Sequence, residues 1–313
     1  MKEGTTSEAA TQRADAVAMY LDLIKLSLTD SIYLNDPLSM YTFCRQRTRS
    51  SARSASAAAR WRQYFIASVE QLLSRYKVRL VKPYYDIDGF EDSSLTARER
   101  LANMRRNGLD WPLRAHTMIG MKRLDNLQFC VETALNDGIK GDLIETGVWR
   151  GGACIFMRAI LKAYGDTART VWAADSFAGL PLPNAEIYQA DAGDKHHSFV
   201  DHLGVSRQAV EDNFRTYNLL DEQVRFLEGW FKDTLPNAPI NHLAILRLDG
   251  DMYESTIQAL ESLYHKLSPG GFVIVDDYIL GPCRQAVTDF RSRNCINNEI
   301  VDIDGVGVFW RKS

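Results

Sequence analysis

Acidic residues gather at two places in the C-terminal half of the chain, each directly after a short apolar run. Residues 243–248 lead into Asp249, and residues 271–275 lead into Asp276 and Asp277. Such runs predict buried strands, and neighbouring parallel strands end at one edge of a sheet. Crowded carboxylates repel one another and raise each other's pKa, which a hard cation relieves. Since Mg²⁺ prefers oxygen ligands, the spacing predicts a Mg²⁺ site on these three aspartates.

The expected chemistry follows from the charge of such an ion. Two adjacent hydroxyls of a substrate can chelate it, and a bound hydroxyl loses its proton more easily. Asp249 is the first candidate for the proton acceptor. The adjacent His196 and His197 are rival bases, with His197 the second catalytic candidate, and a surface or substrate-contact role for this pair stays open. Asp251, two residues past Asp249, receives no ligand role.

A second group of residues predicts an adenosyl cofactor. Glu145 ends an apolar run and precedes a glycine-rich turn whose spacing is not Gly-x-Gly-x-x-Gly, and an acid there would repel a pyrophosphate. It suits the ammonium and sulfonium of S-adenosylmethionine. Asp175, which ends the next run, can accept both hydroxyls of a ribose. The predicted cofactor contacts in this group are Glu145, Thr146, Gly147, Gly151, Asp175, Ser176, Gly229 and Trp230. Core packing remains an equal alternative for Trp230.

These residues require an alternating α/β framework. A helix is expected at about 117–136 and another from residue 153, and the expected strands are 142–146, 170–175, 224–227, 243–248, 272–276, 300–303 and 306–310. Apolar strands separated by helices predict a parallel, doubly wound sheet. The last two strands are too close for a crossover helix and must form a hairpin. The predicted fold class is therefore α/β: a Rossmann-like class I methyltransferase with a seven-stranded mixed sheet, an antiparallel last strand and N-terminal helices.

The N-terminal third has a different texture. Residues 1–12 are expected to be a frayed tail, followed by helices at 16–29, about 61–77 and 96–107. Between residues 45 and 62 there are six arginines and no acid, which predicts a solvated linker; contact with an acidic partner is the alternative. We expect a helical accessory region at 1–110 and a methyltransferase domain at 111–313.

Composition excludes several classes of protein. The 313 residues carry a net charge of −3, which gives no overall attraction to nucleic acid or to anionic membranes. No run reaches the ~20 apolar residues of a membrane span, and the polar N-terminus predicts no signal peptide. The five cysteines show no ligand spacing and are expected to be reduced core thiols of a cytoplasmic protein.

Several motifs in register resemble the macrocin O-methyltransferase family. They are HTMIGMKRLDN at 116–126, LIETGVWRGG at 143–152, DSFAGLP at 175–181, DAGDKHH at 191–197, LDGDMYES at 248–255 and SPGGFVIVDDY at 268–278. The resemblance covers about residues 108–313. Residues 38–82 resemble nothing in that family and are interpreted as an Arg/Ser-rich insertion.

The resemblance implies a Mg²⁺-dependent transfer of methyl groups from S-adenosylmethionine to sugar hydroxyls of glycosylated small molecules. It assigns Asp249, Asp276 and Asp277 to the metal and adds Thr117 and Met118 to the cofactor contacts. It also implies a homo-oligomer, a dimer or larger, with N-terminal helices in the interface. A catechol-like phenol as acceptor and a non-catalytic cofactor-binding scaffold remain alternatives, because a phenol can also present two chelating oxygens.

Overall fold

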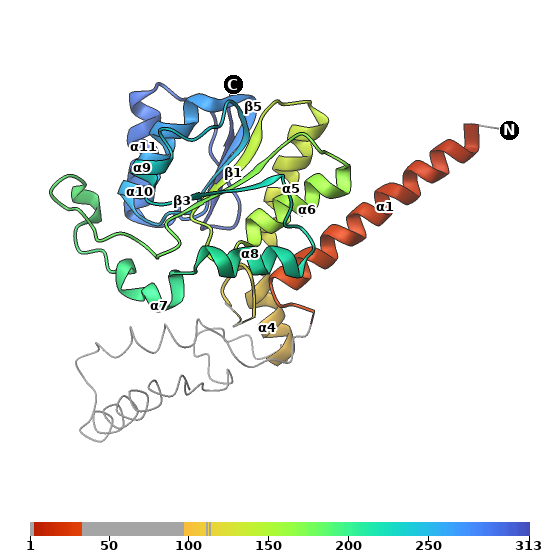
Figure 1. The fold of residues 1–313 in the computed structure, drawn as a ribbon, viewed down its shortest axis with the longest axis horizontal. Coiled ribbons are helices and arrows are strands. Elements are labelled where there is room, and N and C mark those ends of the chain that lie inside the picture. The colour runs from red at the N-terminus through yellow and green to blue at the C-terminus, as the bar shows by residue number, and fades with distance from the viewer. Residues whose placement is uncertain (1–2, 33–96, 111, 113) are drawn as a thin grey trace, which may run out of the picture.

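The computed structural model describes residues 3–32, 97–110, 112 and 114–313. The insertion predicted at 38–82, with the helix expected at 61–77, lies outside the described residues. The fold below therefore concerns one N-terminal helix and the sheet domain (Figure 1).

A seven-stranded sheet with the order β3-β2-β1-β4-β5-β7-β6 forms the centre of the molecule. The strands are β1 (Asp142–Thr146), β2 (Val171–Asp175), β3 (Val224–Glu228), β4 (Leu243–Leu248), β5 (Leu267–Val275), β6 (Val301–Asp302) and β7 (Val308–Arg311). β1 to β5 run parallel, whereas β7 is antiparallel to both β5 and β6. The predicted mixed sheet with an antiparallel last strand is confirmed.

Helices cover both faces of this sheet (Figure 1). One face packs against α5 (Met121–Asn136), α6 (Gly152–Tyr164) and α8 (Arg207–Thr216). The other packs against α10 (Tyr253–Leu263) and α11 (Gly281–Arg293). Alternate residues of a strand face the two helical layers: Leu143 packs in the core on the side of α5 and α6, and Ile144 packs in the core on the side of α10 and α11. Every residue of β4 is buried, as expected for a central parallel strand.

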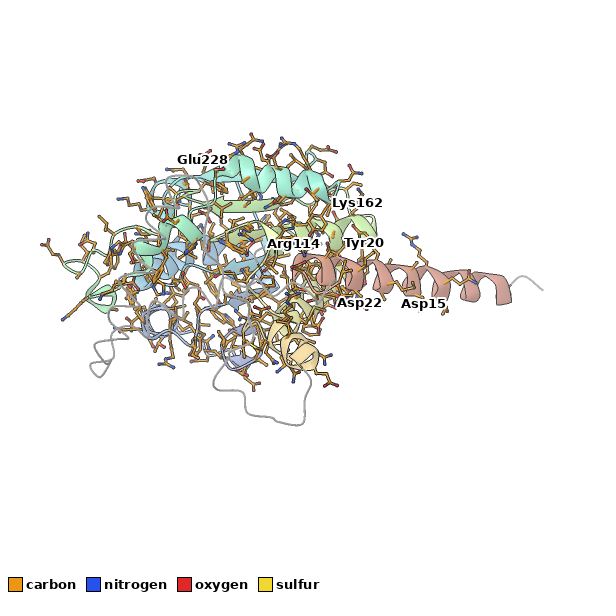
Figure 2. The ribbon with its side chains drawn as sticks, turned by 90° about the horizontal axis from the view of Figure 1, so that it is seen from below. Asp15, Tyr20, Asp22, Arg114, Lys162 and Glu228 are labelled. Atoms are coloured by element: carbon orange, nitrogen blue, oxygen red, sulfur yellow. The ribbon has the colours of Figure 1, made fainter. Side chains whose placement is uncertain are left out.

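The N-terminal helix is longer than the sequence predicts. α1 spans Glu3–Leu28, so the frayed tail expected at 1–12 is wrong for residues 3–12, and the expected helix start at residue 16 is also wrong. Alanine, glutamate and glutamine in this stretch favour a helix even without a buried face. The buried residues Leu21, Ile24 and Leu28 dock the C-terminal end of α1, while the N-terminal part projects from the body in both views (Figures 1 and 2).

Two further expectations need correction. α5 begins at Met121 and not at 117, because Gly120 is extended and packs directly against the backbone of Gly108, at the end of α4 (Ala97–Arg106). Cys130, Cys154 and Cys283 are buried thiols, but Cys295 is exposed in the turn after α11 and is no core residue. Among the described helices none combines the length and apolar character needed to cross a membrane.

Candidate active site

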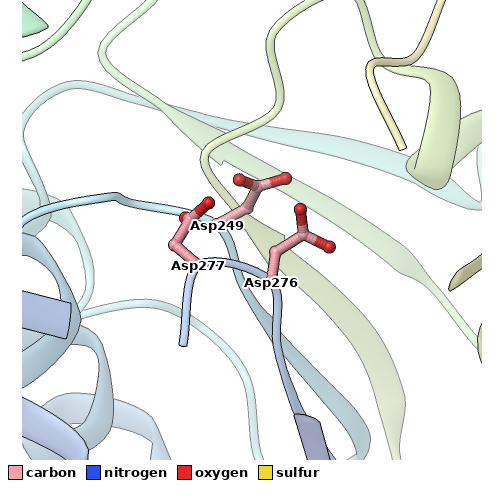
Figure 3. A group of neighbouring side chains, drawn as sticks. All are labelled: Asp249, Asp276 and Asp277. Carbon is pink, nitrogen blue, oxygen red and sulfur yellow. The ribbon is translucent and has the colours of Figure 1, made fainter. Parts of the chain in front are cut away.

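The carboxyl ends of β1, β4 and β5 bring the three predicted aspartates together. Asp249 follows β4, and Asp276 and Asp277 follow β5; one carboxylate oxygen of each lies within 4.8 Å of the others (Figure 3). Backbone bonds align the strand ends, since Asp249 N donates to Thr146 O and Asp276 N donates to Leu248 O, both at 2.9 Å. A β-carbon on Gly147 would lie 1.7 Å from the Asp249 carbonyl oxygen, so β1 and β4 approach closely only because this residue is glycine.

Arg247, which the sequence analysis leaves unassigned, lies among these carboxylates. Its Nη1 donates to Asp249 Oδ2 at 2.7 Å and to Glu145, and its Nη2 donates to Asp276 Oδ1 at 2.5 Å. The spacing of the carboxylates suggests like charges without a counter-charge. The structure instead places one arginine among them. Arg247 is the one charged residue of the run 243–248, which indicates buried partners, but Glu145 and Asp276 belong to other strands and cannot be identified from the run.

Negative charge remains in excess nearest to Asp277. Burial and the carboxylates of Asp251, Asp249 and Asp276 raise the pKa of Asp277 well above its ordinary value. Burial, with Asp249 among the nearby acids, also raises the pKa of Asp251 to about 7, although His196 opposes this. Within the described part of the chain, neither Asp251 nor Asp277 pairs with an arginine or lysine.

This donor set fits a divalent cation of the Mg²⁺ type. Three carboxylates offer hard oxygen ligands at one point, and the two arginines that contact them, Arg247 and Arg123, do not balance their charge together with that of Glu145. The metal remains a prediction that rests on this arrangement.

A cavity of about 560 Å³ opens beside the aspartates. Seven of the predicted site residues line it: Met118, Gly147, Asp175, Ser176, Gly229, Trp230 and Asp249. Its volume is in the usual range for a small-molecule site. The ends of β1, β2, β3 and β4 all contribute to its wall, which is where open α/β sheets bind ligands.

Four other predicted cofactor residues lie beneath the cavity wall and not on it. Glu145 accepts hydrogen bonds from Cys154 N, at 3.1 Å, and from Arg247, so its carboxylate is engaged inside the protein, and burial raises its pKa to about 7. Thr146 and Thr117 are buried. Gly151 starts α6, and a β-carbon there would lie 2.8 Å from Val210. These residues support the wall through the backbone and the core.

Asp175 is held ready at the cavity by two backbone donors. Its Oδ2 accepts from Val148 N at 2.6 Å and its Oδ1 from Phe177 N at 2.7 Å. Burial raises its pKa, and these hydrogen bonds oppose the rise. Ser176 Oγ makes a longer contact to Oδ1, at 3.4 Å, and the carboxylate lines the cavity, where it can accept ribose hydroxyls.

Trp149, Asp251 and the first turn of α10 also line the cavity, which the sequence pattern does not predict. Trp149 adopts φ +47°, an uncommon conformation for a bulky residue, and its Nε1 donates to the His202 carbonyl oxygen at 2.8 Å. This bond ties the glycine-rich turn to α7 (Val200–Leu203), at the far end of the loop that follows β2. The positive φ is not readable from residue type.

The two histidines occupy different environments. His196 Nδ1 bonds to Asp194 Oδ2 at 2.6 Å, and the ring lies close enough to Asp251 for their charges to interact. His197 does not line the cavity, and its buried Nδ1 has no hydrogen-bond partner among the described residues. The geometry thus brings His196, and not His197, toward the carboxylates.

The strand order, the antiparallel β7 and a cavity across the ends of β1 to β4 define a class I methyltransferase fold. The profile of the Macrocin-O-methyltransferase (TylF) family matches residues 17–312. The chain therefore belongs to the macrocin O-methyltransferase family and is an S-adenosylmethionine-dependent O-methyltransferase.

Individual relatives agree with this assignment. The chain is 60% identical over 210 residues to the 8-demethyl-8-(2,3-dimethoxy-alpha-L-rhamnosyl)-tetracenomycin-C 4'-O-methyltransferase of Streptomyces olivaceus, covering 67% of this chain and 80% of that one. It is 57% identical over 212 residues to the mycinamicin III 3''-O-methyltransferase of Micromonospora griseorubida, covering 67% and 83%. The solved structure of the O-methyltransferase NovP matches with a TM-score of 0.74 at 41% identity, covering 95% of this chain and 99% of that one.

Proposed function

We propose that this protein transfers a methyl group from S-adenosylmethionine to a sugar hydroxyl of a glycosylated small molecule, with Mg²⁺ on Asp249, Asp276 and Asp277. The observation that carries the proposal is the cluster of three carboxylates beside a cavity that Asp175 and Gly147 also line. The relatives named above support the acceptor class, since two of them are named for methylation of glycosylated natural products.

The cavity walls would position both reactants. Asp175, Gly147 and Gly229 line the part of the cavity that would hold the adenosyl group. When bound, Mg²⁺ would hold two neighbouring hydroxyls of the acceptor and make one of them more acidic. Methyl transfer needs the attacking oxygen in line with the carbon–sulfur bond, so orientation by the cavity walls contributes strongly.

Asp249, Asp251 and the two histidines His196 and His197 are the candidates for the proton acceptor. Asp249 faces the cavity, but Arg247 holds its Oδ2. Neither histidine is on the cavity wall, and His196 is bonded to Asp194. Asp251 lines the cavity and forms no ion pair with an arginine or lysine among the described residues, so we propose that Asp251 takes the hydroxyl proton.

The test is transfer of a tritiated methyl group to a panel of glycosides and one catechol, with Mg²⁺ and with excess EDTA. We expect transfer to a glycoside that EDTA abolishes, and Asp277→Asn to lose Mn²⁺ binding in a titration followed by electron paramagnetic resonance. Full activity in EDTA would overturn the metal requirement. Transfer to the catechol alone would overturn the acceptor class.

A homo-oligomer is a further proposal, supported by the projecting helix α1. Met19, Leu23 and Leu26 follow one another at helical spacing and are 74%, 56% and 37% exposed. Such a stripe of large apolar side chains on a protruding helix is typical of an interface. We also propose that the protein works in the cytoplasm, in line with its thiols.

A further inference from the structure

Two arginines form a continuous network of ion pairs with the acidic residues of the site. Arg247, 1% exposed, contacts Glu145, Asp249 and Asp276 with one guanidinium group. Arg123, also buried, donates from Nη1 to Asp276 Oδ2 at 2.5 Å and from Nε to Asp304 Oδ2 at 2.9 Å. Each oxygen of the Asp276 carboxylate therefore accepts a bond from a different arginine.

The residues of this ion-pair network come from five separate parts of the fold. Glu145 ends β1, Arg247 lies in β4, Asp276 follows β5, Arg123 is on α5 and Asp304 is in the turn between β6 and β7. Gly307 lies close against this network: a β-carbon there would make tight contacts, 3.2 Å from Arg123 Cδ and 3.4 Å from the Asp276 carbonyl oxygen. The C-terminal hairpin is thereby joined to the metal-binding end of the sheet.

Only a guanidinium group can fill the position of Arg247. Its planar fork presents several N–H donors in fixed directions, so it can bind three carboxylates that surround it. A lysine ammonium carries the same charge on a single atom. Removal of the arginine would leave the buried Glu145 and the partly exposed Asp249 without this counter-charge and Asp276 with Arg123 alone, and an unpaired buried charge is strongly destabilising.

We propose that Arg247 is a positioning residue that acts as a built-in counter-charge for the metal-ligand carboxylates, braced by Arg123 and Asp304. This inference rests on the proposed metal site. Arg247 holds one oxygen of Asp249 and one of Asp276, so that both carboxylates keep their places whether or not a divalent ion is bound. Without Arg247, Arg123 still pairs with Asp276, and the divalent ion becomes the main source of positive charge for Asp249.

The experiment compares the melting temperature in EDTA with that in saturating Mg²⁺. The variants are Arg247→Gln, Arg247→Lys and, as a matched control, Arg215→Gln, which removes an exposed arginine that also pairs with two acids. Arg123→Gln, which removes one bond to Asp276 and one to Asp304, serves if Arg247→Gln does not fold in EDTA. A Mn²⁺ titration of the unchanged protein tests the metal site independently.

We expect the melting temperature of Arg247→Gln in EDTA to lie roughly 10 °C below that of the unchanged protein. Saturating Mg²⁺ should raise the melting temperature of the variant by more than it raises that of the unchanged protein. The melting temperature of Arg247→Lys in EDTA should lie between those of Arg247→Gln and the unchanged protein. Arg123→Gln should show a smaller fall in EDTA and a smaller recovery in Mg²⁺, and Arg215→Gln should match the unchanged protein. An Mg²⁺-induced rise in Arg247→Gln and Arg123→Gln no larger than in the unchanged protein would overturn the inference. Absence of Mn²⁺ binding to the unchanged protein would instead overturn the metal part of the proposed function.

Discussion

Asp249 and Asp251 are separated by one glycine, yet they meet different neighbours. Asp249 ends a buried strand and contacts Arg247. Asp251, with φ +56°, lies on the cavity wall near His196, and its backbone N–H donates to Asp277 Oδ2 at 3.1 Å. The two carboxylates can therefore divide the work, the first holding a cation and the second receiving a proton.

The first prediction follows from this division. Asp251→Asn keeps the shape of the side chain and its place on the wall but removes the acceptor, so kcat should fall by about 10²- to 10⁴-fold. Affinity for Mn²⁺ and for S-adenosylmethionine should stay close to that of the unchanged protein, as measured by titration. A kcat within a few-fold of the original would exclude Asp251 as the base and return Asp249 to that role.

His116 connects three parts of the molecule by its ring and backbone. Its Nδ1 bonds to the Tyr217 hydroxyl at 2.8 Å, that hydroxyl bonds to Ser27 on α1 at 3.2 Å, and His116 N donates to Leu28 O. Burial, reinforced by Arg150, lowers the pKa of His116 from 6.5 to about 4. The folded protein thus favours the neutral ring.

A pH dependence of stability follows from this lowered pKa. Because the folded-state pKa lies below the unfolded value, the stability contributed by neutral His116 is complete above pH 6.5 and is lost as the pH falls toward 4. After allowance for its partial exposure, the loss should be roughly 1–2 kcal/mol. Urea unfolding at pH 7 and pH 5 should show a smaller difference for His116→Gln than for the unchanged protein. Equal differences in the two proteins would contradict this assignment.

At the scale of the elements, the contact between the ends of β1 and β4 sets the shape of the site. Gly147 has φ +91°, and its missing side chain leaves room for the Asp249 carbonyl. The neighbouring helix α6 ends at Gly165, which has φ +72° and open space where a β-carbon would lie. The two glycines share a backbone conformation and differ in what surrounds them.

These glycines give a matched pair of variants. Gly165→Ala should cost about 1 kcal/mol, the strain of a left-handed alanine. Gly147→Ala adds a collision with backbone and should cost more than about 4 kcal/mol, a loss large enough to abolish folding. Thermal melting and soluble yield measure both effects. Similar melting temperatures for the two variants would show that β1 and β4 can separate without harm.

The particular residues show what a sequence can predict here. Asp249, Asp276 and Asp277 are predictable because each ends an apolar run, and strand ends of a parallel sheet meet at one edge. Arg247 is not, because a strand pattern does not say which side chains of β1 and β5 flank a given residue of β4. Glu145 lies near the end of β1, as predicted. Its carboxylate, however, accepts hydrogen bonds from Arg247 and from Cys154 N at the start of α6. The assignment of Thr117, Thr146 and Gly151 to the cofactor stays a prediction, since they lie beneath the cavity wall.

At the scale of the whole molecule, α1 is the least enclosed of the described elements. Its last turns dock on α6, while the part that carries Asp15 extends into solvent (Figure 2). A helix with an exposed apolar stripe gains stability when a second surface covers it.

The oligomer proposal is tested on this stripe. Leu23→Glu places a charge at its middle and should shift the mass in solution toward the monomer, whereas Asp15→Ala on the same helix should leave the mass unchanged. Light scattering coupled to size-exclusion chromatography measures both. A monomeric unchanged protein, or a Leu23→Glu variant of unchanged mass, would remove the stripe from the interface.

Because β7 is antiparallel to β5, the residues that follow β7 lie toward the edge of the sheet opposite the aspartates. Val308 pairs with Val275 beside the aspartates, whereas Arg311 pairs with Phe272, toward the opposite edge of the sheet, and Lys312 continues that edge by bonding to Gly270 and Gly271. The C-terminus therefore leaves the molecule on the side away from the cavity. A fusion partner or a surface anchor attached there would hold the enzyme with its substrate entrance facing the solution, which favours this end for immobilised use.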